Sequence, residues 1–283
     1  MTGQEARRAK RYDGRRGRRS VTGWTVERAA EELLRAEEAR ADRGRLTDEW
    51  PELDLATAYR VQDEALRRRL ARGERLVGVK LGLTSRAKQR RMGIDSPLTA
   101  WLTDAMALPA GAAVPQGRLI HPRVEPEIVF VLGERLAGPG VSAARALAAV
   151  EHVCAGAEVI DSRFRDFSFA LPDVVADNAS SAAFVLGATR LPPGGLDLAA
   201  EAVTVEVDGA VVHTGTGADV QGHPAEALAL AANSLAGRGL AIEPGQVVLT
   251  GGLTDAVFAP PGARVTLRFA NLGSIELDGG VTA

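Results

Sequence analysis

The 283-residue sequence has only one cysteine, Cys154, and aromatic residues make up 4% of it. A single cysteine forms no disulfide within the chain and supplies no cysteine cluster for zinc or an iron–sulfur centre. The sequence also lacks an apolar run of about 18 residues, the length of a membrane span, and a secretory signal with an apolar core. These absences predict a soluble cytoplasmic protein without contact to a membrane.

A strong charge imbalance is missing as well. The chain carries 34 Lys and Arg against 36 Asp and Glu, a net charge of −2, so it has no overall attraction to nucleic acid or to a membrane surface. Lysine is scarce, and the only lysines are Lys10, Lys80 and Lys88. Because arginine is the usual cation of this sequence, a lysine in an apolar setting invites a chemical explanation.

Residues 1–22 form a basic segment with few apolar side chains. Its basic residues are Arg7, Arg8, Lys10, Arg11, Arg15, Arg16, Arg18 and Arg19. Such a composition predicts a disordered tail. It is the only feature that favours a nucleic-acid partner, and a solvated tail is the better interpretation.

The rest of the chain, in a sequence that is 46% hydrophobic, can bury a sizeable core. Apolar residues at helical spacing predict one helix from Thr25 to about Asp42 and a second from Asp54 to near Gly73. We therefore expect an N-terminal helical region over residues 23–75, followed by a second region over residues 76–283.

The second region consists of short apolar or alternating runs separated by glycine and proline. Strands are predicted at 76–82, 123–133, 156–164, 181–188, 202–209, 246–252 and 263–270. Helices are predicted at 142–153 and 224–236, and Cys154 is expected at the end of the first, as a small buried side chain. The strands are too irregularly spaced for a βαβ repeat. We predict an α+β fold with a mixed, strongly curved sheet and an N-terminal helical cap.

Two glutamates, Glu125 and Glu127, lie two residues apart in the segment RVEPEIVFVLG. Side chains alternate between the faces of a strand, so both carboxylates should point the same way. Like charges at this distance repel unless a cation lies between them. Oxygen ligands favour Mg²⁺ or Mn²⁺, and Glu158 in AEVIDSRF offers a third ligand. The alternative is the polar face of an edge strand, which Pro126 would suit.

Further candidates surround these glutamates. Lys80 lies in the otherwise uncharged run LVGVKLGLTS, where burial should lower its pKa and make it a proton donor or acceptor. Lys80 and Arg163 are also candidate cations for an anionic substrate. Asn178 and Ser180 in VVADNASS are either pocket residues or turn residues. His121 precedes a proline, and we favour a hydrogen-bonding role for it over that of a base.

The segment Thr250–Gly251–Gly252 follows an apolar strand. Glycine lets backbone N–H groups converge on an anion, although a tight turn needs no ligand. The sequence contains no GxxxxGK[ST] phosphate loop, no GxSxG motif and no HExxH zinc motif.

The stretches GVKLGLTSRAKQRRMGIDSP, LIHPRVEPEI, EVIDSRF, VVADNASS, GHP and VLTGG occur in this order along the chain. Together they resemble the 4-oxalocrotonate decarboxylase and 2-oxopent-4-enoate hydratase family, a branch of the fumarylacetoacetate hydrolase superfamily. The resemblance spans roughly residues 53–276 and implies that residues 76–283 form the catalytic β-roll of that superfamily. It favours the metal site over the edge strand, with Mg²⁺ or Mn²⁺ on Glu125, Glu127 and Glu158.

The resemblance also implies a functional Lys80, a pocket residue at Ser180 and a substrate carboxylate near Thr250, Gly251 and Gly252. The implied reaction is decarboxylation of 2-oxohex-3-enedioate to 2-hydroxypenta-2,4-dienoate. Hydratases of the family often have an acid after the proline near position 97, where this chain has Leu98 and Thr99. This favours the decarboxylase, although the decarboxylases usually have an aromatic–Gly pair at the position of Thr99 and Ala100.

Three alternatives stay open. They are 2-oxopent-4-enoate hydratase, a carbon–carbon hydrolase of the wider superfamily, and a non-catalytic partner of the hydratase. The expected partners are a small 2-oxo acid, further copies of the chain in a homo-oligomer, and a companion hydratase.

Overall fold

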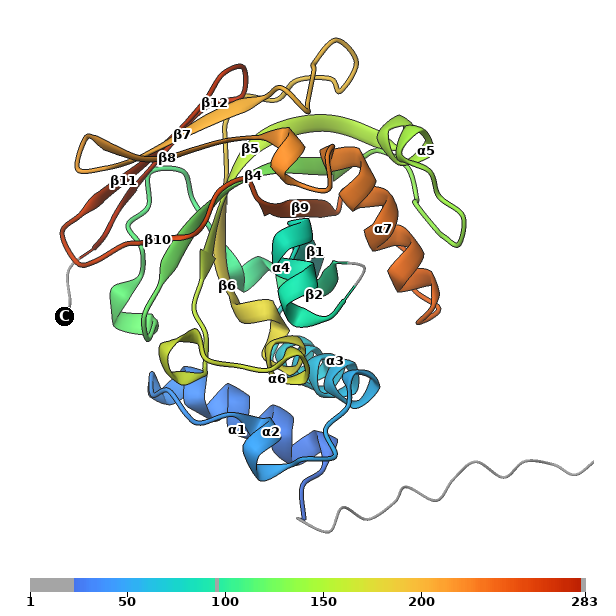
Figure 1. Ribbon diagram of the computed structural model, residues 1–283, viewed down its shortest axis with the longest axis vertical. Coiled ribbons are helices and arrows are strands. Elements are labelled where there is room, and N and C mark those ends of the chain that lie inside the picture. Colours follow the sequence, from blue (N-terminus) through green and yellow to red (C-terminus); the bar gives the residue numbers. More distant parts are fainter. Residues whose placement is uncertain (1–22, 95–96, 281–283) are drawn as a thin grey trace, which may run out of the picture.

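The computed structural model describes residues 23–94 and 97–280, so the predicted basic tail lies outside the described residues. The curved sheet arches over the centre of the molecule, the N-terminal helices lie beneath it, and a smaller sheet lies to one side (Figure 1). The fold is α+β with a curled mixed sheet, as predicted. None of the described helices combines the length and the apolar character that a membrane span needs.

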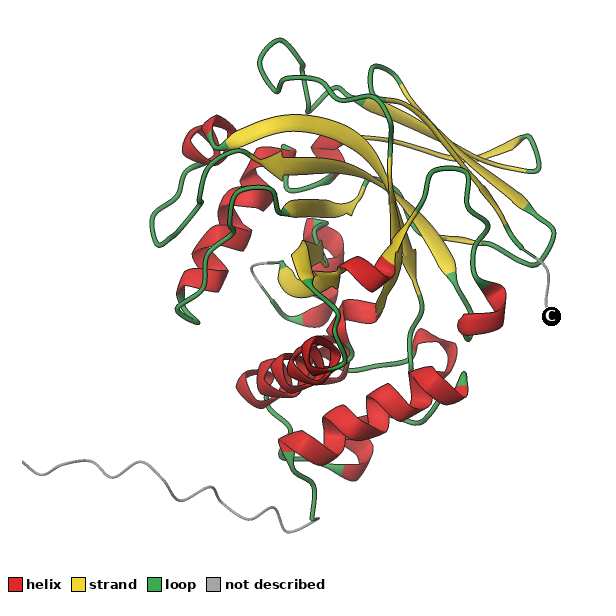
Figure 2. Cartoon of the chain, turned by 180° about the vertical axis from the view of Figure 1, so that it is seen from behind, coloured by secondary structure: helices red, strands yellow, loops and turns green. Residues whose placement is uncertain are grey.

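The N-terminal region contains α1 (Val26–Ala39), α2 (Leu46–Glu49) and α3 (Leu55–Ala71). The two longer helices begin at polar caps, because the side chains of Thr25 and Asp54 accept hydrogen bonds from the backbone three residues on. An apolar cluster joins these helices to α6 (Leu171–Ala176) and to Leu98 of the sheet. The helices therefore cover one end of the curved sheet, which Figure 2 shows from behind.

The larger sheet has the strand order β2-β1-β9-β4-β5-β6-β3, with β10 paired to β4. Its strands are β1 (Leu76–Gly82), β2 (Leu98–Thr103), β3 (Ala107–Leu108), β4 (Arg123–Leu132), β5 (Val150–Ile160), β6 (Ser181–Leu186), β9 (Val247–Gly252) and β10 (Val257–Phe258). The β1–β9 and β3–β6 pairs are parallel and the others are antiparallel. Strands β4 and β5 are long and buried along most of their length, so they form the central part of the curved sheet.

The smaller sheet has the order β12-β11-β7-β8 and is antiparallel throughout. Its strands are β7 (Ala202–Val207), β8 (Ala210–Thr216), β11 (Arg264–Phe269) and β12 (Gly273–Asp278). The remaining α-helices are α4 (Arg86–Met92), α5 (Ala143–Ala148) and α7 (Pro224–Ala236). Short 3₁₀ turns lie at Asp104–Met106, Gln116–Arg118, Arg165–Phe167, Asn178–Ser180 and Gly217–Asp219. One apolar cluster takes side chains from both sheets and from α5 and α7.

The structure corrects one predicted helix. The helix expected at 142–153 ends at Ala148, and β5 begins at Val150. Cys154 is therefore a buried strand residue rather than the end of a helix. A short apolar run of this kind is compatible with a helix and with a strand. Pairing with β4 makes the residues from Val150 onward a strand.

Candidate metal and substrate site

Three glutamates meet on the inner side of the roll. Glu125 and Glu127 lie on β4, and Glu158 lies on β5 directly opposite Glu125 in the strand register. One carboxylate oxygen of each residue lies within 4.8 Å of those of the other two. Glu127 and Glu158 are fully buried, whereas Glu125 is half-buried. Like charges placed opposite each other destabilise a sheet, so this arrangement calls for a cation.

The donor set fits a divalent cation that prefers oxygen. Glu127 Oε2 accepts a hydrogen bond of 2.7 Å from the backbone N–H of Gly251, and Glu158 Oε2 accepts one of 2.9 Å from Lys80 Nζ. The other oxygen of each carboxylate, Oε1, is buried and has no hydrogen-bond partner within the described residues. Burial and the neighbouring Glu158 hold the pKa of Glu127 well above its usual range. These oxygens would gain most from a bound cation.

Lys80 lies at the bottom of the same site, with a side chain that is 3% exposed. The predicted lowering of its pKa is wrong. Burial does act in that direction, but the charges of Glu158, Glu125 and Glu127 outweigh it and raise the pKa. Lys80 therefore holds its proton and its positive charge beside the acidic residues.

The glycine segment supports the acidic residues. The Gly251 N–H donates to Glu127, and the Thr250 hydroxyl donates to the carbonyl of Ile128 within the sheet. Gly251 has φ +111°, and a Cβ there would lie 2.2 Å from Thr84 Oγ1, so only glycine fits. A Cβ on Gly252 would lie 3.1 Å from the carboxyl carbon of Glu125. In this structure the Gly251 N–H binds the carboxylate of Glu127 and is not open to the substrate carboxylate that we expected there.

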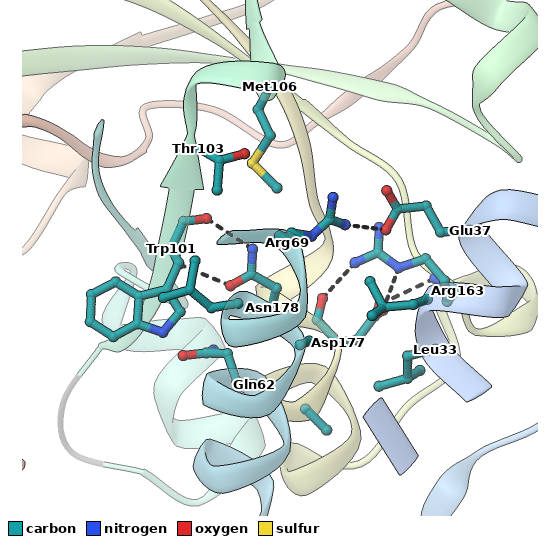
Figure 3. Close-up of a pocket in the computed structure, with 14 residues that line it drawn as sticks. Leu33, Glu37, Gln62, Arg69, Trp101, Thr103, Met106, Arg163, Asp177 and Asn178 are labelled. Atoms are coloured by element: carbon teal, nitrogen blue, oxygen red, sulfur yellow. Dashed lines mark hydrogen bonds and ion pairs between the residues drawn. The ribbon is translucent and has the colours of Figure 1, made fainter. Parts of the chain in front are cut away.

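Residues Asn178, Ala179 and Ser180 form a left-handed turn with φ values of 50°, 49° and 59°. Three successive non-glycine residues in this conformation are costly, and such strain is typical of functional sites. Ser180 lines the cleft described below, and its buried hydroxyl has no hydrogen-bond partner within the described residues. Asn178 faces away from the cleft, because its amide forms two hydrogen bonds of 2.9 Å with the backbone of Trp101 (Figure 3).

Arg163 does not line the cleft, contrary to our expectation of a substrate contact. Its guanidinium pairs with the carboxylate of Asp177 and donates a hydrogen bond of 2.6 Å to the carbonyl of the same residue (Figure 3). A further hydrogen bond of 2.6 Å goes to the carbonyl of Asp161. Burial raises the pKa of Asp177 to about 6, although Arg163 opposes this shift. A buried arginine must have its donors satisfied by the protein, and these partners leave it no role toward a substrate. Arg163 instead fixes the start of the turn that carries Ser180.

His121 also has a structural role, as we favoured. Its Nε2 lies 2.7 Å from the carbonyl of Ser162, and its ring packs against that of Phe167. Both oxygens of Asp161 accept backbone N–H groups, from Ile120 and His121. Asp161 is therefore occupied with the chain and is not a fourth member of the acidic group.

A cleft of about 760 Å³ opens onto the site between the curved sheet and the segments around α2 and α6. Lys80, Glu125 and Ser180 line it, so half-buried Glu125 connects the acidic group to the open space. The cleft is also lined by two cations that were not predicted from the sequence, Arg123 and Arg45. Arg123 could have been found, because it precedes Glu125 by two residues and so shares its face of β4. Arg45 could not, because only tertiary packing brings it here.

Comparison with known proteins agrees with this geometry. A sequence model described as "Fumarylacetoacetate (FAA) hydrolase C-terminal" matches residues 77–278. The chain is 43% identical over 258 residues to a 4-oxalocrotonate decarboxylase of Pseudomonas sp. strain CF600, covering 91% of this chain and 98% of that protein. It is 41% identical over 234 residues to a 2-hydroxyhexa-2,4-dienoate hydratase of Comamonas testosteroni, covering 82% and 89% respectively.

A solved structure supports the same assignment. The 4-oxalocrotonate decarboxylase of Pseudomonas putida G7, complexed with magnesium and adipate, superposes with a TM-score of 0.87 at 42% identity and covers 89% of this chain and 96% of that one. A curled mixed sheet with converging carboxylates thus defines the class of fold. The chain belongs to the fumarylacetoacetate hydrolase family, in the branch of 4-oxalocrotonate decarboxylases and dienoate hydratases.

Proposed function

We propose that the protein is a divalent-metal-dependent decarboxylase, a carbon–carbon lyase that converts 2-oxohex-3-enedioate (4-oxalocrotonate) to 2-hydroxypenta-2,4-dienoate and CO₂. The observation that carries the proposal is the acidic group Glu125, Glu127 and Glu158, closed on one side by Lys80 and opening into a cleft on the other. The similarity to decarboxylases over nearly the whole chain supports the same reaction.

The reaction needs a place for negative charge. When the C5–C6 bond breaks, its electron pair forms the C4–C5 double bond, the C3–C4 double bond shifts to C2–C3, and the 2-oxo oxygen becomes negative. Carbon 6 leaves as CO₂, and one proton taken up at that oxygen gives the product. The substrate thus carries its own electron sink, and no organic cofactor is required.

Glu125, Glu127 and Glu158 would hold Mg²⁺ or Mn²⁺ through carboxylate oxygens. The bound ion would supply electrophilic stabilisation of negative charge on the 2-oxo oxygen. Gly251 orients Glu127, and Lys80 orients Glu158, because each donates a hydrogen bond to the carboxylate.

Lys80 has a second role in this scheme. Three carboxylates and one divalent ion leave a net charge of about −1, which repels a dianionic substrate, and the ammonium of Lys80 offsets it. Ser180 lines the cleft, and its hydroxyl, which has no hydrogen-bond partner within the described residues, would bind the substrate's 1-carboxylate or 2-oxo oxygen. Lys80 thus offsets charge and Ser180 orients the substrate. Both interactions are stronger where protein groups take the place of water.

The second candidate is 2-oxopent-4-enoate hydratase, because hydratases are nearly as similar to the chain. Leu98 favours the decarboxylase. It lines the cleft where the family resemblance leads us to expect the hydratase's acidic residue, and an apolar side chain cannot activate a water molecule. A carbon–carbon hydrolase would need such an activated water too. A non-catalytic partner of the hydratase has no need for the buried lysine and acidic group.

The test is a spectrophotometric assay of the purified protein with Mg²⁺, offered 2-oxohex-3-enedioate and 2-hydroxypenta-2,4-dienoate in parallel. We expect consumption of the first with release of CO₂, and none with Glu125→Gln. Consumption of the second alone would establish the hydratase. Magnesium binding without turnover of either compound would favour the non-catalytic partner.

A further inference from the structure

The cleft contains an arginine that the chemistry above does not use. Three described cationic side chains line it, namely Lys80, Arg45 and Arg123. Lys80 is bonded to Glu158, and Arg45 donates to the hydroxyl and the carbonyl of Ser168. The guanidinium of Arg123 forms no hydrogen bond or ion pair within the described part of the chain. Its carbon Cζ lies 4.2 Å from the centre of the Phe167 ring.

Contact with Phe167 holds Arg123 in place without using its donors. A cation above an aromatic face is attracted by the ring, and the N–H groups at the edge of the guanidinium stay available. Arg123 is half-buried, which strengthens a charged interaction compared with one in open water. Five N–H donors in a planar fork match a carboxylate in two-point geometry.

The position of Arg123 also fits the length of the substrate. Arg123 and Glu125 lie on the same face of β4, and Cα atoms two residues apart on a strand are separated by about 6.7 Å. Six backbone bonds span this step, whereas a six-carbon dicarboxylate has five carbon–carbon bonds in a row. A substrate whose 2-oxo end lies at the acidic group is therefore long enough to reach Arg123 with its other end.

We propose that Arg123 determines specificity by binding the second carboxylate, at the end of the substrate remote from the 2-oxo group. The proposal rests on the proposed function and adds the residue that selects dicarboxylates over monocarboxylates. The cleft also has acidic residues, Glu125, Asp166 and Asp255, so an unpaired distal carboxylate would be repelled there.

The reaction gives this residue a recognisable kinetic effect. The distal carboxylate loses its charge as it becomes CO₂, so its attraction to Arg123 is strongest in the bound substrate and weakens toward the transition state. Such an interaction contributes to binding and not to the chemical step. Replacing Arg123 should therefore raise KM for 2-oxohex-3-enedioate without lowering kcat.

The decisive experiment measures binding without turnover. Isothermal titration calorimetry in the presence of Mg²⁺ compares 2-oxoadipate with 2-oxohexanoate, which differ only in the distal carboxylate and lack the double bond that the reaction needs. We expect the unsubstituted protein to bind 2-oxoadipate about 10- to 100-fold more tightly, the worth of a hydrogen-bonded charge. Arg123→Gln should remove this preference and leave the affinity for 2-oxohexanoate unchanged within about 2-fold.

Two further variants complete the design. Arg123→Lys keeps the charge but not the fork and should retain part of the preference. Arg135→Gln removes an exposed arginine beyond the opposite end of β4 and should retain all of it. An undiminished preference in Arg123→Gln overturns the proposal, as does an equal loss for both ligands. Failure of the proposed reaction appears separately, as absence of turnover by the unsubstituted protein.

Discussion

Lys80 Nζ lies 2.9 Å from Glu158 Oε2, although their strands, β1 and β5, are separated in the sheet by β9 and β4. In a flat sheet three inter-strand steps amount to about 14 Å. The contact exists because the sheet curls until its inner face meets itself. Curvature of the sheet is therefore what creates the site, and the charges that line it depend on one another.

Lys80→Met separates charge neutralisation from metal binding. Removing one partner of a buried ion pair leaves Glu158 uncompensated, so we expect the metal-free protein to lose about 3–5 kcal/mol of stability. Metal affinity should change little, because the loss of a competing cation offsets the loss of the hydrogen bond that orients Glu158, whereas turnover should fall steeply. Chemical denaturation with and without Mg²⁺, together with calorimetric titration of Mg²⁺, checks both statements. Undiminished turnover would contradict the role given to Lys80.

Glu127→Gln should have opposite effects on stability and on metal binding. The amide keeps an oxygen acceptor for the Gly251 N–H. It replaces a buried carboxyl group whose pKa is raised by burial and by the neighbouring Glu158. We expect a higher Tm in EDTA, and a dissociation constant for Mg²⁺ that is at least about 10-fold higher. Differential scanning fluorimetry over a Mg²⁺ series measures both. Glu134→Gln, at an exposed position just after β4, is the matched control and should change neither.

Asn178 should be a positioning residue that keeps β2 against the strained turn. Asn178→Ala leaves the N–H and the carbonyl of Trp101 without their partners, and alanine tolerates the left-handed backbone less well. We expect a loss of about 2–4 kcal/mol in urea denaturation. Asn178→Asp still accepts from the Trp101 N–H but cannot donate to its carbonyl, so its loss should be intermediate. Equal stability of both variants would contradict this assignment.

Cys154 should be unreactive in the folded protein. Its side chain is 2% exposed, and burial raises the pKa of its thiol to about 11. At pH 8 only about a thousandth of such a thiol is ionised, and the thiolate is the reactive form. Ellman's reagent should therefore find no fast thiol at pH 8 in buffer and one thiol per chain in 6 M guanidinium chloride. Rapid labelling of the folded protein would refute this expectation.

Much of the fold follows from local patterns. Strands β1, β4, β7, β9 and β11 and helix α7 were predicted within about two residues, because buried strands and capped helices leave clear periodicities. Strands β2, β8 and β12 and the two-residue strands β3 and β10 were not predicted. β2 is buried at every position and β8 is largely exposed, so neither alternates between apolar and polar residues. What makes them strands is the neighbour with which they pair, and that information is not local.

The site shows the same division. Spacing placed Glu125 and Glu127 on one face, and the local sequence made Glu158, Lys80 and Ser180 candidates. The likeness to a known family then favoured the metal site and a pocket role for Ser180. Polar residues at turns were harder to interpret. Three polar residues were predicted to line the pocket but form hydrogen bonds and ion pairs with the protein itself, namely Arg163, Asn178 and Thr250. Only the register of the strands and the direction of a turn decide whether such a side chain faces the ligand or the protein.

The contribution of Arg45 to the cleft has a consequence for how such enzymes diverge. The family match begins at residue 77, yet Arg45 belongs to the segment before it and reaches the cleft through Ser168. The acidic group and the part of the cleft wall around Arg45 thus come from different stretches of the gene. Exchange of the leading helices would therefore change the wall of the cleft and leave the acidic group as it is.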